Sequence, residues 1–431
     1  MHRRFSRRAF TLSAVALPFA PTVRAAEARQ AQITDFGAAA DDATVNTRAI
    51  QSAIDHLATQ DGGTVVVPKG VFVSGAIFLK PKVNLHLEAG AVLKASTDLS
   101  NFPVQRTRIE GHFEPAFNPG LVNARGCDGL RITGPGTLDG NGRPIWDLFW
   151  KLRNAAPDPH NFPNIGVPRA RLAVIEDSRD VIIDGVTFKD SQFWNLHLYR
   201  CQDVQVLNTS FEVPDDYKQA PSTDGIDLDS CQRVLIDGCL FSVTDDCIAA
   251  KGSKGPHALD DKDSPPVEHI RVRNCVFKRG YGVFTCGSEA TVVRDVIVED
   301  STIGDVDVAV LKLRPDTPQL YEDIHFRNLA LASDRKFLLA IRPWTQYVDL
   351  KGAPPPHSTI RNISIEGAKG HFGALGVIAG NPGQSEIGDI RLKDIDLQLT
   401  AATPLKAQAV PGLHLDNVLV NGKAFTSQAV D

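Results

Sequence analysis

The sequence has no apolar run of the roughly 18 residues that a membrane-spanning helix needs. We therefore expect no membrane association of the mature protein. Cysteine is scarce as well: seven cysteines are too few for a disulfide scaffold, and their odd number leaves at least one thiol unpaired within one chain. Because no C-x-x-C pair occurs, no zinc site or thioredoxin-like motif is indicated, and we interpret the thiols as structural.

The N-terminus has the composition of an export signal. Four arginines within residues 3–8 precede an apolar stretch from Ala9 to Ala20, and Val23-Arg24-Ala25 fits a cleavage site. The run from Ser6 to Leu12 resembles a twin-arginine signal, which exports folded proteins from the bacterial cytoplasm. We predict that residues 1–25 are such a signal peptide and that the mature protein is periplasmic or extracellular. The alternative is a basic amphipathic helix of the mature fold.

Composition and charge limit the class of protein and its partners. With 42% hydrophobic and 23% charged residues, the chain is neither disordered nor collagenous. Removing the five arginines of the signal lowers the formal net charge from −5 to about −10. Such a charge repels polyanions at long range, so we expect no nucleic-acid partner. A polyanionic substrate would have to be captured by a local cationic patch.

One sequence pattern recurs through the chain. Its form is Asp-Val-x-Ile-x-Asp/Asn-x-x-Phe, and its clear copies begin at Arg179, Gln202, Gln232, Glu268 and Arg294. Their spacings of 23, 30, 36 and 26 residues are typical of stacked structural units. Each copy alternates apolar and polar residues over two short strands and then turns. Because no helical pattern separates the copies, the sequence predicts an all-β, parallel β-solenoid.

One helix is predicted before the repeats. Asn46 can cap it, Gly62-Gly63 ends it, and its apolar face is formed by Ile50, Ile54 and Leu57. Such a helix would cover the open apolar end of the solenoid.

No inter-domain linker is present, so we predict a single domain over residues 30–431. Two polar insertions, Asp215–Pro221 and Ser253–Val267, interrupt the repeats, and insertions of this kind commonly wall a binding face.

Acidic residues concentrate in two of the predicted coils. Aligning Ile226 with Ile248 places Asp224 and Asp246 in register, 22 residues or one coil apart, with Asp245 next to Asp246. Three neighbouring carboxylates repel, so at least one should have a raised pKa and hold a proton near neutrality. A protonated acid opposite ionised carboxylates is what acid–base hydrolysis of an acetal requires. Aspartates also favour turns, but three in register favour a functional site.

The following coils add an aromatic residue and two cations. Tyr281, within Gly280-Tyr281-Gly282, is expected in the column above Asp224 and Asp246. Lys312 and Arg314 lie two residues apart and hence on one strand face. Two cations beside acids suit a substrate that is itself a carboxylate. The alternative is that they neutralise the acids or lie in solvent.

These residues resemble glycoside hydrolase family 28, the polygalacturonases and their relatives, over nearly all of the mature sequence. The stretch from Asp35 to Gly70 and the segment Asp190 to His197 are similar to the family's sequences. The family's Asn-Thr-Asp motif matches Ser222-Thr223-Asp224, and its Asp-Asp motif matches Asp245-Asp246. The resemblance implies a right-handed parallel β-helix and inverting hydrolysis of pectic glycosidic bonds without a metal or cofactor. It also implies that Asp245 is the general acid and that Asp224 and Asp246 activate the water.

Three positions depart from the family's motifs. Ser222 replaces an asparagine, Tyr281 stands where the family has histidine, and Lys312-Leu313-Arg314 replaces Arg-Ile-Lys. The resemblance still implies that Ser222, Tyr281, Lys312 and Arg314 bind substrate. Because the family's histidine is missing, a rhamnogalacturonan-type or other uronic-acid linkage is an alternative to galacturonan as the substrate.

Two other functions fit a β-helix with an acidic cluster. One is a Ca²⁺-dependent pectate lyase that uses the aspartates as metal ligands. The other is a non-catalytic carbohydrate-binding protein, which Tyr281 makes more credible. The three-aspartate pattern favours the hydrolase, with a pectic polysaccharide or oligosaccharide as substrate. We expect the protein to be a monomer.

Overall fold

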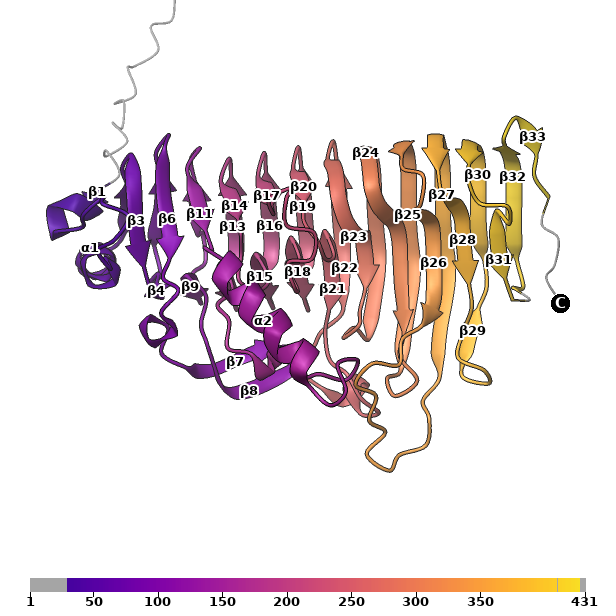
Figure 1. Cartoon of the computed structure of the whole chain (residues 1–431), viewed down its shortest axis with the longest axis horizontal. Coiled ribbons are helices and arrows are strands. Elements are labelled where there is room, and N and C mark those ends of the chain that lie inside the picture. Colours follow the sequence, from indigo (N-terminus) through magenta and orange to yellow (C-terminus); the bar gives the residue numbers. More distant parts are fainter. Residues whose placement is uncertain (1–28, 409, 427–431) are drawn as a thin grey trace, which may run out of the picture.

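The strands of the chain stack side by side along one long axis (Figure 1). The computed structural model describes residues 29–408 and 410–426, so the predicted signal peptide lies outside the described residues. Thirty-one strands form one sheet, and successive coils pair in parallel. For example, three strands of one coil (β12, β13 and β14) pair with the corresponding three of the next (β15, β16 and β17). The predicted parallel β-helix is confirmed.

The strands stack in three rows, named A, B and C. Row A contains β4 (Ile77–Phe78), β9 (Val122–Arg125), β12 (Ala173–Glu176), β15 (Leu196–Tyr199), β18 (Ile226–Asp229), β21 (Ile248–Lys251), the carboxyl ends of β23 (Val276–Cys286) and β24 (Val292–Leu313), β26 (Phe337–Pro343), β28 (Ala374–Ile378) and β31 (Leu405–Ala407). Row B contains β1 (Gln30–Gln32), β2 (Gly63–Val67), β5 (Val83–Leu87), β10 (Arg131–Thr133), β13 (Arg179–Asp184), β16 (Gln202–Leu207), β19 (Gln232–Asp237), β22 (Val267–Arg273), the start of β24, β25 (Gln319–Ala332), β27 (Ser358–Phe372), β29 (Ser385–Ile387), β30 (Ile390–Leu399) and β32 (Leu413–Val420). Row C begins with β3 (Gly70–Ser74), β6 (Ala91–Ala95), β11 (Thr137–Asp139), β14 (Thr187–Lys189), β17 (Ser210–Glu212) and β20 (Leu240–Ser242) and continues through the longer strands.

A few elements lie outside the rows. They are helices α1 (Thr47–Thr59) and α2 (Arg143–Ala155), the antiparallel hairpin β7 (Gln105–Ile109) and β8 (His112–Phe117), the closing strand β33 (Lys423–Ala424), and 3₁₀ turns at Ile33–Phe36, Leu99–Asn101, Asn164–Gly166 and Ala258–Asp260. In Figure 1 the hairpin and α2 lie on the same side of the solenoid.

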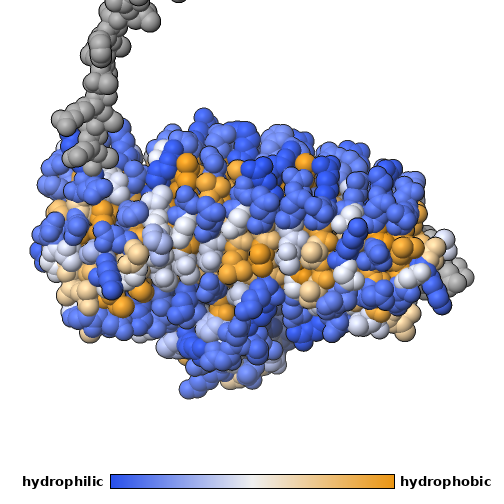
Figure 2. All heavy atoms as spheres, turned by 90° about the horizontal axis from the view of Figure 1, so that it is seen from above, coloured by the Kyte–Doolittle hydropathy of each residue, from blue (hydrophilic) through white to orange (hydrophobic). Residues whose placement is uncertain are grey.

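The recurring pattern explains the interior. Its Val, Ile and Phe positions are buried in one continuous core that runs through the coils. The Phe positions form a ladder in which Phe188, Phe211, Phe241 and Phe277 stack with ring centroids 4.9–5.0 Å apart. Polar residues of the alternating pattern face outward, and hydrophilic side chains cover much of the face in Figure 2. The seven cysteines are buried with free thiols.

The polar residues of the pattern form the turns. Asp180 and Asp203, the second residues of β13 and β16, have φ of 53° and 57°, and Asn208 and Gly238, directly after β16 and β19, have φ of 48° and 68°. Asp, Asn and Gly are the residues that adopt this left-handed conformation most readily. The repeated Asp/Asn and Gly therefore set the corners of each coil.

The two helices differ from the prediction in detail. Helix α1 buries Ile50, Ile54 and Leu57 against the first coils, as predicted. Asn46 precedes it, but its side chain bonds to the Ala39 main chain and makes no capping bond to the helix. Helix α2 was not predicted, because it interrupts the repeats only once. Its proline at the start and its buried Ile145, Trp146 and Phe149 are a helical signal.

The phenylalanine ladder leads to a stability prediction. Phe241→Ala removes a fully buried ring that stacks on rings in both neighbouring coils, so it should lower the free energy of unfolding by about 3–5 kcal/mol. Val276→Ala, at an exposed position of the neighbouring coil, should change it by less than about 0.5 kcal/mol. Denaturant unfolding followed by circular dichroism measures both. Equal losses in the two variants would contradict a stabilising ladder.

Candidate active site

Row A carries acidic residues just before two neighbouring strands, β18 and β21. Ile226 pairs with Ile248, and the Gly225 N–H donates to the Asp246 carbonyl oxygen at 2.9 Å. Asp224 and Asp246 therefore occupy the same position of successive coils, and the register predicted from the sequence is confirmed. Because paired strands lie about 4.8 Å apart, the two side chains are neighbours.

A cleft over row A brings most of the predicted site residues together. Of those predicted, it is lined by Ser222, Asp224, Asp245, Asp246, Tyr281 and Lys312. It is also lined by residues that the sequence analysis did not select, namely Glu110, Arg153, Asn164, Trp194, Lys251, Ser288, Glu289, Trp344, Gln346 and Tyr347. Arg314 does not line it.

Asp246 is held rigidly at the floor of the cleft. Lys312 Nζ donates to its Oδ2 at 2.9 Å, and Thr285 Oγ1 donates to its Oδ1 at 2.6 Å. All three side chains are buried. Charge-assisted bonds of this kind are short and strong, and they fix the orientation of the side chain.

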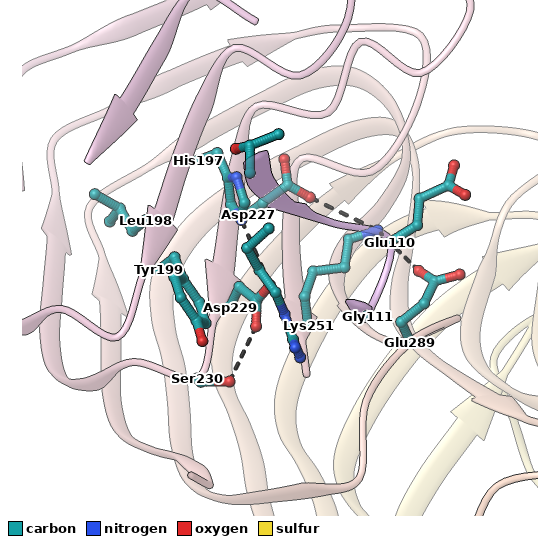
Figure 3. Close-up of polar contacts among 12 residues, drawn as sticks. Glu110, Gly111, His197, Leu198, Tyr199, Asp227, Asp229, Ser230, Lys251 and Glu289 are labelled. Carbon is teal, nitrogen blue, oxygen red and sulfur yellow. Dashed lines mark hydrogen bonds and ion pairs between the residues drawn. The ribbon is translucent and has the colours of Figure 1, made fainter. Parts of the chain in front are cut away.

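Lys251 is the central cation among the other acids. Its Nζ lies 3.4 Å from Asp224, 3.6 Å from Asp227 and 3.8 Å from Glu289. Figure 3 shows it between Asp227 and Glu289. The same Nζ lies 4.9 Å from the centre of the Trp194 ring. A single buried lysine thus partly balances three carboxylates.

Lys251 neutralises these carboxylates only in part, and the pKa values of the acids depart from their ordinary values. Burial, reinforced by the neighbouring charges of Asp224 and Asp246, raises the pKa of Asp245 to about 8. Burial and Asp227 likewise raise the pKa of Asp224. Burial also acts to raise the pKa of Glu289, but Lys251 and other cations outweigh it and hold that pKa below its ordinary value. Asp245, partly exposed in the cleft, is therefore protonated at neutral pH.

Asp227 and Asp229 lie beneath the cleft on strand β18. Asp227 is fully buried, neither of its carboxylate oxygens has a hydrogen-bond partner among the described residues, and burial raises its pKa to about 7. Asp229 accepts a bond from Arg108 Nε at 3.3 Å. Although burial opposes it, contact with His197 and Arg108 lowers the pKa of Asp229. The two aspartates of one strand thus have opposite protonation preferences.

Tyr281 lies on the coil that follows Asp245 and Asp246. Its N–H donates to the Asp245 carbonyl oxygen at 2.8 Å, and the Cys247 N–H donates to the Gly282 carbonyl oxygen at 2.8 Å, so Tyr281 and Gly282 lie over the two acids. Its ring and the Trp344 ring flank Lys312 Nζ, with centroids 4.9 and 4.8 Å away. The Tyr281 hydroxyl contacts Arg342.

The predicted pairing of Lys312 with Arg314 in the cleft is wrong. Strand β24 ends at Leu313, so the alternation of faces does not continue to Arg314. The buried Arg314 guanidinium donates to Asp316 at 2.8 and 2.7 Å and to the carbonyl oxygens of Gln346 and Tyr347 at 3.0 and 2.8 Å. It therefore anchors a loop that lines the cleft and does not itself face a ligand.

Ser222 is tied to the wall of the cleft through Asn164. Ser222 Oγ donates to Asn164 Oδ1 at 3.0 Å, and Asn164 Nδ2 donates to Glu110 Oε1 at 2.7 Å. Buried Arg169 donates to Asn164 and to the Pro221 carbonyl oxygen. The side chain of Asn164 therefore supplies an amide beside the position where Ser222 replaces the asparagine of the motif.

The walls come from segments distant in sequence. Glu110 is at the tip of the β7–β8 hairpin, and residues 344–347 lie between β26 and β27. Tyr347 donates its hydroxyl to the Phe162 carbonyl oxygen, and Gln346 Nε2 donates to that of His160 at 2.9 Å. The predicted insertions do not line this cleft. Ser253–Val267 instead packs against the hairpin, where Asp261 contacts Arg108 at 3.3 Å.

Within residues 29–408 and 410–426, no group of three or more His, Cys, Asp or Glu side chains is arranged to hold a metal ion. In the same part of the chain, no helix is long and apolar enough to cross a membrane.

The sequence model of Glycosyl hydrolases family 28 matches residues 63–413. The chain belongs to glycosyl hydrolase family 28. Its parallel β-helix is the fold that the sequence resemblance implied.

Several known proteins are similar to the chain. It is 25% identical over 394 residues to the exo-poly-alpha-D-galacturonosidase of Dickeya chrysanthemi, covering 80% of this chain and 63% of that protein. It is 28% identical over 273 residues to an exopolygalacturonase of Zea mays, covering 57% and 59%. The exopolygalacturonase structure from Thermotoga maritima shares the fold, with a TM-score of 0.72, 24% identity, and coverage of 92% and 93%. The chain spans 54–63% of the length of the first curated relatives.

The sequence analysis missed several residues of this family 28 cleft. Lys251 pairs with Asp229 of the preceding coil and is the last residue of the strand that follows Asp246. Extending the predicted register to the end of this strand could have identified it. Trp194 likewise precedes Leu196, the partner of Ile226. Glu110, Trp344 and the other wall residues come from irregular segments, and no periodic signal marks them.

Replacing Asp227 or Asp229 by asparagine should change the pH dependence of stability in opposite ways. Because the pKa of Asp227 is raised in the folded protein, the wild type loses stability as the pH rises from about 4 to 7. Asparagine cannot ionise, so the Asp227→Asn variant does not have this loss. Relative to wild type, Asp227→Asn should therefore become more stable as the pH rises from 5 to 8. Asp229→Asn should be less stable than wild type throughout this range, because its carboxylate is already stabilised.

Melting temperatures of the three proteins at pH 5, 6, 7 and 8 measure these effects. A difference between Asp227→Asn and wild type that is the same at every pH would show that Asp227 does not titrate in the folded protein.

Proposed function

We propose that the protein is an exported glycosidase that hydrolyses pectic glycosidic bonds, of galacturonan or rhamnogalacturonan type, by inverting acid–base catalysis. The observation that carries the proposal is that Asp245, whose pKa is raised by burial and by its acidic neighbours, lines one cleft together with Asp224 and Asp246. Asp245 donates its proton to the glycosidic oxygen as the bond from that oxygen to the anomeric carbon breaks. Asp224 and Asp246 activate the water that adds to that carbon: the Asp246 carboxylate, held by Lys312 and Thr285, takes its proton, and Asp224 beside it orients the water. One water is consumed, and two hydroxyl-ended sugars leave.

The cations of the cleft support an acidic sugar as substrate. Lys312 Nζ lies between two aromatic rings at the cleft surface and beside Asp246. The aromatic faces of Tyr281 and Trp344 offer apolar surface for a sugar ring, and the ammonium group offers a partner for its carboxylate. The similar proteins are named for galacturonan hydrolysis, which supports the same substrate class.

The walls support action at chain ends. Residues 344–347 bond to residues 160–162, and the hairpin tip adds Glu110, so segments from three parts of the chain enclose the cleft. We infer that these segments block one end of the cleft, so that the end of a polymer chain can enter it but the polymer cannot pass lengthwise through it. Arg314 holds this loop through two carbonyl oxygens.

The alternatives are less favoured. Membership of family 28 favours hydrolysis over elimination by a Ca²⁺-dependent lyase and over binding without catalysis. Export through the predicted signal peptide at residues 1–25, a single mature domain and a monomeric state belong to the proposal and rest on the sequence alone.

The role of Asp245 is tested by Asp245→Asn. Asparagine keeps the shape of the side chain but cannot donate a proton, so release of new reducing ends from oligogalacturonates should fall by about 10²–10⁴-fold while substrate binding persists. Asp307→Asn is the matched control, because Asp307 is buried in a later coil, accepts a bond from the Phe337 N–H and does not line the cleft. Near wild-type turnover of Asp245→Asn would reject the assignment.

Chain-end action is tested by the time course of products. Wild-type enzyme should release one short product from the first minutes, while the viscosity of the polymer falls slowly. Arg314→Ala loosens the wall, so it should increase the share of internal cleavage. Early products of many lengths from the wild type would show that the cleft is open.

A further inference from the structure

A second hollow adjoins the catalytic cleft across Tyr281. It is lined by Lys218, Gln219, Val243, Thr244, Arg279, Gly280, Tyr281, Asp305, Arg335 and Lys336. Tyr281 also lines the catalytic cleft, so the two hollows share this side chain as a common wall. Lys218 and Gln219 belong to the insertion Asp215–Pro221, which therefore walls this hollow and not the cleft itself. We name this hollow the basic pocket.

Its charge is unbalanced. Four cationic side chains face one acid, Asp305, which is already paired with Arg335. Lys336 Nζ donates to the Gly280 carbonyl oxygen at 3.0 Å, the one bond that it makes among the described residues. Several unneutralised cations in one concave site create a local positive potential that attracts anions. The pocket therefore has cationic groups in excess of those that its own acid can pair.

Arg279 adds a positive charge that is held in place. Its Nη2 donates to the carbonyl oxygens of Val213 and Pro214, at 2.6 and 3.3 Å. These two residues directly precede the insertion Asp215–Pro221, so the bonds fix the guanidinium beside the segment that walls the pocket.

The position of the pocket suits an extended substrate. Its residues precede the row A strands, as Lys336 precedes β26 and Thr244 precedes β21. Glu289 and the hairpin residue Glu110 lie beyond the opposite, carboxyl ends of these strands. A chain whose end is held against that wall would leave the cleft over Tyr281 and reach the basic pocket.

We propose that the basic pocket is a substrate subsite that binds the carboxylate of a uronic-acid residue next to the sugar cleaved at the aspartates. This inference rests on the proposed function and deepens it. Lys336, Lys218 and Arg279 supply positive charge from three segments of the lining. A neutral sugar would leave the excess charge uncompensated, whereas a carboxylate balances it and accepts several hydrogen bonds.

The test compares binding of trigalacturonate and of its methyl ester, measured by calorimetry in an Asp245→Asn background. Lys336→Met and Lys218→Met each keep the length of the side chain and remove its charge. Each should weaken trigalacturonate binding by about 10-fold. Binding of the uncharged ester should change by less than about twofold, because the lost interaction needs a carboxylate.

Lys278→Met is the control. Lys278 is exposed and close in sequence, and it pairs with Asp215 at 3.1 Å, but it does not line the pocket. Its substitution should change neither ligand's binding by more than about twofold. If both pocket variants bind trigalacturonate as tightly as the control, or if the acid and the ester weaken equally, the subsite is rejected. Absence of any trigalacturonate binding also rejects it.

Failure of the proposed function gives a different result. If the protein is not a pectic hydrolase, the wild type releases no new reducing ends. The binding comparison then still decides whether the basic pocket binds a carboxylate.

Discussion

The hydrogen-bonded register between neighbouring coils is the constraint on which the site depends. Each row A strand pairs residue for residue with the next, so a side chain's neighbours on the adjacent coils are fixed by the fold. The pairing of Ile226 with Ile248 is sufficient to bring Asp224 next to Asp246 and Asp229 next to Lys251. A shift of one residue would point the acids into the apolar interior. The phenylalanine ladder and the left-handed corner residues maintain this register along the whole solenoid.

The register brings several carboxylates together, and the nearby cations neutralise them only in part. The protonation of the acids in the cleft depends on this partial neutralisation. Lys312 is bonded to Asp246 at 2.9 Å, whereas Lys251 is shared among Asp224, Asp227 and Glu289 at 3.4–3.8 Å. The acids therefore differ in their pKa values although they lie together. Full neutralisation would ionise every carboxylate and leave no acid. Burial, together with neighbouring carboxylates that the cations only partly neutralise, raises the pKa of Asp245 and favours its protonated form.

The features that repeat could be predicted from the sequence, and those that occur once could not. The alternation of Val and Ile, the turn residues and the one-coil spacing of Asp224 and Asp246 specify the solenoid and its acids, because every coil applies the same local rule. Arg314 was misplaced because strand β24 ends one residue before it. The walls, including Tyr347, depend on long-range bonds between irregular segments. Helix α2 is the exception, since its proline and apolar spacing were readable.

Inverting hydrolysis by Asp245 with Asp224 and Asp246 is the central claim, and the anomeric configuration of the first product tests it most directly. Proton NMR of an oligogalacturonate mixed with wild-type enzyme would follow the new reducing end before it mutarotates. Attack of a water on the face opposite the leaving group predicts that the anomer opposite to the cleaved linkage appears first. Initial formation of the same anomer as in the substrate would contradict the account.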